Sequence, residues 1–184
     1  MRKKLLALVL SLGLLSALLP VGQAAERPWQ DWVPEWDYGE RDLYGYKEGE
    51  KWVIPPQFDA ADWFDKAGHA VVGKDGKYGI IDTSGAFVLP PAYDDIGQAS
   101  PDGLRWFKEN GKYGVMTATG DVLHSADIEA DWMGWFVNGS CVYAVGEKYG
   151  LVGKDGKRLT EPVYDEIESW FDIMDSAAYS VHRC

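Results

Sequence analysis

A short signature, Lys-Tyr-Gly, recurs along the chain at a nearly constant spacing and limits the possible folds more than any other feature. It occurs at 77–79, 112–114 and 148–150, so its tyrosines are separated by 35 and 36 residues. An earlier copy, Tyr44-Gly45, lacks the lysine. Repeats of this length are typical of structural units that stack on their neighbours. The sequence therefore predicts four units, at about 44–77, 78–112, 113–148 and 149–184.

Each unit has the features of an antiparallel β-hairpin. Apolar segments flank the dipeptides 75–76 (Asp-Gly) and 110–111 (Asn-Gly), which favour type I′ turns because both central residues need a positive φ. The Gly-Glu pair at 146–147 suits a type II′ turn. Turns of two residues fix the register, and each repeated glycine is then expected to face a bulky residue that shields its backbone. The predicted pairs are Val72 with Gly79, Phe107 with Gly114, and Tyr143 with Gly150.

A second turn, Asp-x-x-Gly at 82–85, precedes an apolar strand that runs into Pro90-Pro91. Proline lacks the N–H that a strand donates to its neighbour, so this strand must end there or lie at a sheet edge. Two or three short strands cannot bury an apolar face alone. The predicted fold class is therefore all-β: a tandem array of about four 35-residue antiparallel β-hairpin units, open or superhelical, with a small propeller-like closure as the alternative.

The tandem Tyr-Gly pairs, the Asp-x-x-Gly turn and the Pro-x-Tyr-Asp ending resemble the WG β-repeat family of bacterial proteins, in which the first pair is often Trp-Gly. The resemblance covers about 44–184 and implies a repeat architecture, with no catalytic residue to transfer. The third unit departs most, since it lacks the prolines and the aromatic residue before its acid. The repeat-defining residues are Tyr44, Gly45, Tyr78, Gly79, Tyr113, Gly114, Tyr149 and Gly150.

The first 25 residues have the pattern of a secretory signal. Basic residues at 2–4 precede an apolar run at 5–19 and small residues at 22–25. The run is short for a membrane span, which needs about 20 residues. We expect cleavage after Ala24 or Ala25 and a secreted or cell-envelope location. A lipoprotein is not expected because no cysteine precedes Cys141, and no membrane contact is expected beyond the signal.

The net charge and the absence of catalytic motifs from the sequence limit the possible functions. Removal of the three basic residues in 1–25 leaves 15 basic and 29 acidic residues, a net charge of −14 that disfavours nucleic acid as a partner. The three histidines occupy different repeat positions, and the serine-hydrolase and zincin motifs are absent from the sequence. We therefore predict no enzyme activity, no cofactor and no metal site. Whether Cys141 pairs with Cys184 stays open, as does the oligomeric state.

One acidic residue occupies the same position in every unit. Such a row of carboxylates could bind Ca²⁺ or a basic partner, or each acid could accept backbone N–H groups at a turn. Repetition favours the second interpretation, because each unit must solve the same local problem. The four acids are Asp59, Asp94, Glu129 and Asp165.

Aromatic residues are dense in the segment 26–43, which includes Trp29, Trp32 and Trp36. Exposed rings could stack on sugars, whereas rings folded inward would form a cap over the open edge of the first unit, and the edge argument favours the cap. Further along, Trp63, Trp132 and Trp170 are expected to pack between neighbouring units.

The leading functional hypothesis is an exported, non-enzymatic repeat scaffold that binds a protein or a cell-envelope component. The alternative is a carbohydrate or cell-wall binding module that uses exposed Trp and Tyr. The candidate binding surface comprises Trp29, Trp32, Trp36, Asp59, Asp94, Glu129 and Asp165.

Overall fold

The computed structural model describes residues 27–39, 42–171 and 177–182. The predicted signal peptide and Cys184 lie outside these residues. The described chain forms one short 3-10 helix, η1 (Pro28–Asp31), and strands that pair in antiparallel fashion. The all-β prediction is confirmed.

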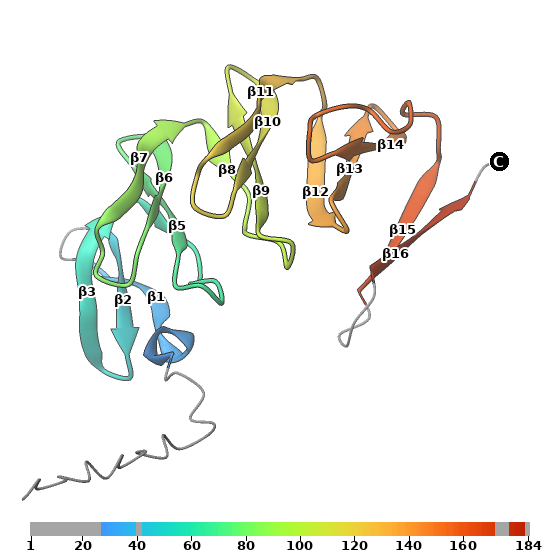
Figure 1. Cartoon of the computed structure of the whole chain (residues 1–184). Coiled ribbons are helices and arrows are strands. Elements are labelled where there is room, and N and C mark those ends of the chain that lie inside the picture. Colours follow the sequence, from blue (N-terminus) through green and yellow to red (C-terminus); the bar gives the residue numbers. More distant parts are fainter. Residues whose placement is uncertain (1–26, 40–41, 172–176, 183–184) are drawn as a thin grey trace, which may run out of the picture.

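The strands form five sheets in chain order, which we call sheets I to V (Figure 1). Sheet I contains β1 (Val33–Trp36), β2 (Tyr44–Glu48) and β3 (Lys51–Phe58). Sheet II contains β4 (Ala60–Ala61), β5 (Ala70–Lys74), β6 (Lys77–Ile81) and β7 (Phe87–Tyr93). Sheet III contains β8 (Asp95–Ile96), β9 (Leu104–Glu109), β10 (Lys112–Thr117) and β11 (Val122–Ile128). Sheet IV contains β12 (Trp132–Val137), β13 (Ser140–Val145) and β14 (Lys148–Gly153), and sheet V pairs β15 (Glu166–Phe171) with β16 (Ala177–His182).

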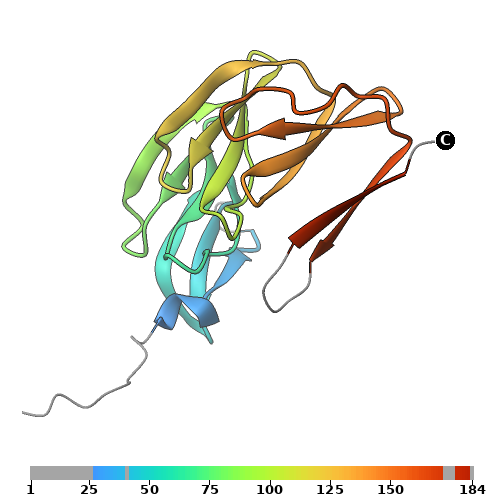
Figure 2. The same cartoon turned by 45° about the vertical axis from the view of Figure 1, so that its right-hand side comes forward.

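The sheets follow one another along a curved path, and the first and last lie at opposite ends of it (Figure 1). The view turned by 45° also shows the sheets succeeding one another in chain order (Figure 2). The array is therefore open, and the alternative of a propeller-like closure does not hold for the described sheets.

The hairpin registers match the sequence prediction. Asp75 and Gly76 both have positive φ, as do Asn110 and Gly111. The predicted opposite pairs are all present: Val72 with Gly79, Phe107 with Gly114, and Tyr143 with Gly150. The register was predictable because a two-residue turn fixes it locally.

The sheets are offset from the sequence units. The unit boundary at 77–78 falls inside the β5–β6 hairpin, and the boundary at 112–113 falls inside β9–β10. One sequence unit therefore supplies β6 and β7 to sheet II and then β8 and β9 to sheet III. Each unit is in this way shared between two consecutive sheets.

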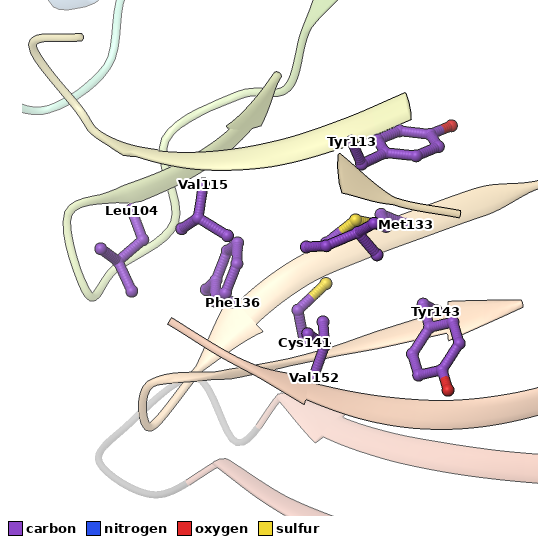
Figure 3. Close-up of a cluster of buried hydrophobic side chains, with 9 residues drawn as sticks. Leu104, Tyr113, Val115, Met133, Phe136, Cys141, Tyr143 and Val152 are labelled. Atoms are coloured by element: carbon purple, nitrogen blue, oxygen red, sulfur yellow. The ribbon is translucent and has the colours of Figure 1, made fainter. Parts of the chain in front are cut away.

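The hydrophobic core is divided among the junctions between sheets. Tyr46 and Phe58 of sheet I pack with Val72 of sheet II. Ile80 of sheet II packs with Phe107 of sheet III in a second cluster. A third cluster joins sheets III and IV and includes the residues labelled in Figure 3, which are Leu104, Tyr113, Val115, Met133, Phe136, Cys141, Tyr143 and Val152. Sheets I to IV thus bury apolar side chains against one another at three successive junctions.

The repeated glycine after each tyrosine is required by a close backbone approach. The third strand carries extra residues at this point, where the register shifts between Tyr78–Tyr93 and Ile80–Leu89. A Cβ on Gly79 would lie only 2.5 Å from the carbonyl oxygen of Leu89. The carbonyls of Ile54, His124 and Thr160 approach the other three glycines in the same way, at 2.5, 2.8 and 3.0 Å. The expected ring shield is present at Gly114 and Gly150, where the rings of Phe107 and Tyr143 also fill the Cβ position.

The prolines are tolerated because they lie in this irregular part of an edge strand. Strand β7 continues through Pro90 and Pro91 to Tyr93 and forms the edge of sheet II, as β3 does in sheet I. The missing N–H groups therefore leave no inner strand without a partner.

Candidate functional site

The repeated acids lie at the links between sheets, which are the segments that join the last strand of one sheet to the first strand of the next. Lys77 Nζ on β6 is 2.6 Å from Asp94 Oδ1, and Lys112 Nζ is 2.9 Å from Glu129 Oε1. Lys148 pairs with Asp165 in the same way. In each case the lysine that precedes the Tyr-Gly pair binds the acid 17 residues further along the chain. The pKa of Asp94 is lowered chiefly by its hydrogen bond with Lys77, and that of Glu129 chiefly by Lys112.

The link acids also hold the hairpin turn of the following sheet. The backbone N–H of Asp75 donates to Asp59 Oδ2 at 2.6 Å. Asp94 accepts the backbone N–H groups of Asn110 and Gly111. These carboxylates therefore satisfy turn donors and tie one sheet to the next, as the structural interpretation of the acids proposed.

The third link divides these two tasks between two residues. Glu129 binds the lysine, whereas the N–H of Gly146 donates to Asp131 Oδ2 at 2.7 Å. The backbone N–H of Asp131 also donates to the carbonyl of Ala144, as the N–H of Asp94 does to Lys108, both at 2.8 Å. The sequence alignment of units gave no reason to single out Asp131.

Two tryptophans of the N-terminal segment fold inward. The indole N–H of Trp29 donates to the carbonyl of Asp65 at 3.2 Å. Trp32 packs on the core between sheets I and II and meets Phe64 edge to face, with ring centres 5.6 Å apart. The same segment supplies β1, which pairs with β2 as the outer strand of sheet I. These contacts match the cap interpretation.

Trp36 has a different position, because it lines a pocket on sheet I. The pocket has a volume of about 370 Å³, and its walls also include Tyr38, Trp52, Pro55 and Pro56. Tyr38 is 82% exposed, and its φ of 39° lies in the left-handed region. A bulky side chain in that region marks local backbone strain.

Two opposite charges complete the pocket wall. Lys47 Nζ lies 4.7 Å from the centre of the Trp52 ring and 3.9 Å from Glu35 Oε1. Asp37 Oδ1 accepts the N–H of Leu43 at 3.2 Å. Asp37 Oδ2 is buried and has no hydrogen-bond partner among the described residues. An unsatisfied buried acceptor costs about 1–3 kcal/mol, so this oxygen favours an added donor.

Comparison with known proteins assigns the repeats. Residues 46–78 and 78–113 each match the family model described as "WG containing repeat". Residues 46–113 therefore contain two consecutive repeats of the WG β-repeat family. The matched residues are successive units that begin beside β2 and β6, so the family repeat has the same phase as the sequence units and the same offset from the sheets.

Solved structures add a distant likeness. A chain described as "Crystal structure of the eukaryotic initiation factor" is 14% identical, with a TM-score of 0.45. The match covers 68% of this WG-repeat chain, which in turn spans 40% of that chain. No curated protein matches the sequence.

The WG units also leave apolar residues exposed at equivalent positions of their third strands. Phe87 and Val88 begin β7, and Val122 and Leu123 begin β11. They are exposed by 36%, 41%, 50% and 47%, respectively. Leu159 takes the corresponding place in the next unit and is 58% exposed. We call these five residues the outer apolar row, because all of them are exposed to solvent.

The prediction for the later tryptophans was wrong in two cases. Trp63 and Trp132 are 56% and 50% exposed, so neither is packed between units. The ring of Trp132 instead lies over Gly134 of its own strand. The side chain of Trp170 falls outside the described part of the chain. Local sequence could not distinguish these rings from those of Trp106 and Trp32, which pack against core clusters formed by two sheets.

A buried arginine ties sheet II to sheet III. Arg105 is 2% exposed, and its guanidinium donates to Asp65 Oδ2 at 2.8 Å, to the carbonyl of Ala118 at 3.0 Å and to that of Gly97 at 3.2 Å. Burial lowers the pKa of Arg105, while Asp65 opposes that shift. Nearby, burial raises the pKa of Asp62. Sequence inspection did not identify this group, because its members are far apart in the chain.

The other candidates for chemistry among the described residues are a cysteine thiol and the histidine and acidic side chains. Cys141 is fully buried, and burial raises its thiol pKa to about 12. Within that part of the chain, no three His, Cys, Asp or Glu side chains gather as a metal site would require. Within the described ranges, no helix has the length and hydrophobicity that a membrane span needs.

Proposed function

We propose that this WG-repeat chain is an exported, non-enzymatic scaffold that binds a protein of the cell envelope through the outer apolar row. Export is supported by the signal pattern at 1–25. A scaffold role is supported by the use of the repeated acids and lysines to join one sheet to the next.

The observation that carries the proposal is the repetition of the exposed row. Single exposed apolar side chains are normal on protein surfaces, but their recurrence at equivalent positions of successive units favours a repeated contact with a partner. Here Phe87-Val88 and Val122-Leu123 stand at the same place in consecutive sheets, with Leu159 following. An array of this kind presents its partner with several equivalent contacts.

The test is a binding experiment with the mature chain and solubilised envelope proteins. The variant Val122→Ser/Leu123→Ser should lose capture of the partner while keeping the thermal transition of the unchanged protein. Val145→Ser is the matched control, because Val145 is similarly exposed, at 40%, but lies at the end of β13 outside the row. Equal capture by both variants would refute the row as the binding surface. A hydrolytic activity lost on one point substitution would refute the non-enzymatic part.

A second candidate function is carbohydrate binding. The pocket around Trp36, Tyr38 and Trp52 favours it, because accessible aromatic rings beside polar groups suit a sugar, which has apolar C–H faces and hydroxyl edges. A pull-down on insoluble polysaccharide or peptidoglycan tests it. We expect Trp29→Ala and Trp32→Ala to leave retention of the chain on the polysaccharide unchanged, because both rings are used in the cap.

A further inference from the structure

We infer that the pocket on sheet I binds one neutral pyranose unit of a saccharide, with the sugar stacked on the aromatic side chains that line it and a hydroxyl donated to Asp37. This inference rests on the second candidate function and gives it a site. The pocket volume of about 370 Å³ lies at the lower end of the range for small-molecule sites, which suits a single ring more than a long segment.

The first support is the unsatisfied carboxylate oxygen. Asp37 lines the pocket, and its Oδ2 has no donor within the described part of the chain. A ligand O–H can reach this oxygen only if the Asp37 side chain rotates, because Oδ2 is buried while Oδ1 accepts the N–H of Leu43. Sugars supply several hydroxyl donors on each ring, so the acceptor selects for them.

The second support is the strained presentation of an aromatic ring. Tyr38, which lines the pocket, has a φ of 39° and is 82% exposed. An exposed ring gains little for the fold, and a positive φ costs a bulky residue conformational energy. Backbone strain of this kind is typical of functional positions. The ring stands beside Trp36 and Trp52 in the pocket wall, so a flat apolar sugar face can contact aromatic surface.

The third support is the balance of charge. Asp37 is negative and Lys47 is positive, so the pocket wall favours neither an anionic nor a cationic ligand. Lys47 already lies over the Trp52 ring, the place that a ligand cation would take. A neutral ligand therefore fits better than a quaternary amine or a uronic acid.

A proline-rich peptide is the main competing occupant, because such peptides dock in aromatic grooves. It fits less well here, since proline has no N–H to donate and would leave Asp37 Oδ2 unsatisfied. The two occupants can be separated by direct titration.

The experiment uses the mature full-length chain and three soluble probes: chitotetraose, maltotetraose and decaproline. Binding is measured by calorimetry, with tryptophan fluorescence as a second readout. We expect at least one saccharide to bind at millimolar or lower concentration and decaproline not to bind. Tyr38→Ala and Asp37→Ala should each weaken saccharide binding at least tenfold while leaving the melting temperature unchanged within a few degrees. Trp63→Ala, which removes an exposed ring outside the pocket, is the matched control and should bind normally.

Each other outcome overturns the inference in a recognisable way. Saccharide binding that Trp63→Ala abolishes and Tyr38→Ala does not would keep the carbohydrate function and remove this pocket. If neither saccharide binds, both the carbohydrate-binding function and this pocket as its site are refuted. Decaproline binding that depends on Tyr38 would assign the pocket to a peptide. Trp52→Ala serves as a third variant: it should weaken saccharide binding like Tyr38→Ala, and a folded Trp52→Ala chain that binds normally would count against the pocket.

Discussion

The junction between sheets II and III differs from the junction between sheets III and IV in what it buries. The first places Arg105 beside an apolar cluster that includes Ile80 and Phe107, and ties it to Asp65. The second buries a cluster of apolar side chains with the thiol of Cys141 among them. Each junction is spanned by one sequence unit, because each unit is shared between two consecutive sheets. The difference shows that the repeat fixes strand geometry while leaving each junction free to be stabilised by its own chemistry.

The largest effect is expected from breaking the charged junction. Arg105→Ala leaves Asp65 without its cation and the carbonyls of Gly97 and Ala118 without a donor, so we expect a loss of about 3–5 kcal/mol in the free energy of unfolding. Urea denaturation measures it. If Arg105→Ala costs no more than an exposed substitution such as Lys66→Ala, the buried pair does not stabilise this junction.

The apolar junction should respond nearly as strongly. Phe136→Ala removes a ring that is 1% exposed, and a cost of about 3–4 kcal/mol is expected. Amide hydrogen exchange should show that protection falls in β9, β10, β12 and β13 and stays unchanged in β2. Uniform loss of protection across sheets I to IV would mean that the array unfolds as one unit and that the junctions are not separable.

The split link gives a smaller and more specific contrast. Asp131→Ala removes the acceptor of the Gly146 N–H and should cost about 1 kcal/mol or less. Glu129→Ala removes only an exposed partner of Lys112 and should have a weaker effect. Equal effects, measured by thermal unfolding at low ionic strength, would contradict the division of tasks between these two acids.

The smallest effect concerns pH at the charged junction. Burial raises the folded-state pKa of Asp62, so folding favours its protonated form. This contribution is present below the ordinary pKa of 3.8 and is lost as the pH rises through the raised folded-state value. Asp62→Asn should therefore stabilise the protein at pH 7 and make no difference near pH 3. Stabilisation of equal size at both pH values would show that Asp62 titrates normally.

Several parts of the structure followed from local sequence. Turn dipeptides such as Asp75-Gly76 fixed the strand register, since a two-residue turn leaves no freedom in pairing. The recurrence of apolar strands predicted cores between neighbours, and the clusters at three junctions match that expectation. The structural use of Asp94 was also predictable, because every unit needs the same turn donors satisfied.

Other parts depended on contacts between distant segments. The carbonyl of Leu89 lies over Gly79 because strand β7 contains a bulge. The adjacent prolines signal irregular pairing, but they do not give the position of the bulge. The pocket was only partly anticipated through Trp36, because Trp52 and Lys47 enter it from other strands. The Arg105–Asp65 pair joins residues 40 positions apart and has no repeat counterpart to draw attention to it.

The central claim is that a single sheet of this array is not stable without its neighbours. Circular dichroism and urea denaturation test it most directly, on the isolated segment 60–93, which contains all of sheet II, and on residues 26–184 for comparison. The account predicts no cooperative transition and no β signal for the segment, because Val71 and Val72 would face water on opposite sides of the sheet. A monomeric segment with a sharp unfolding transition would contradict the account.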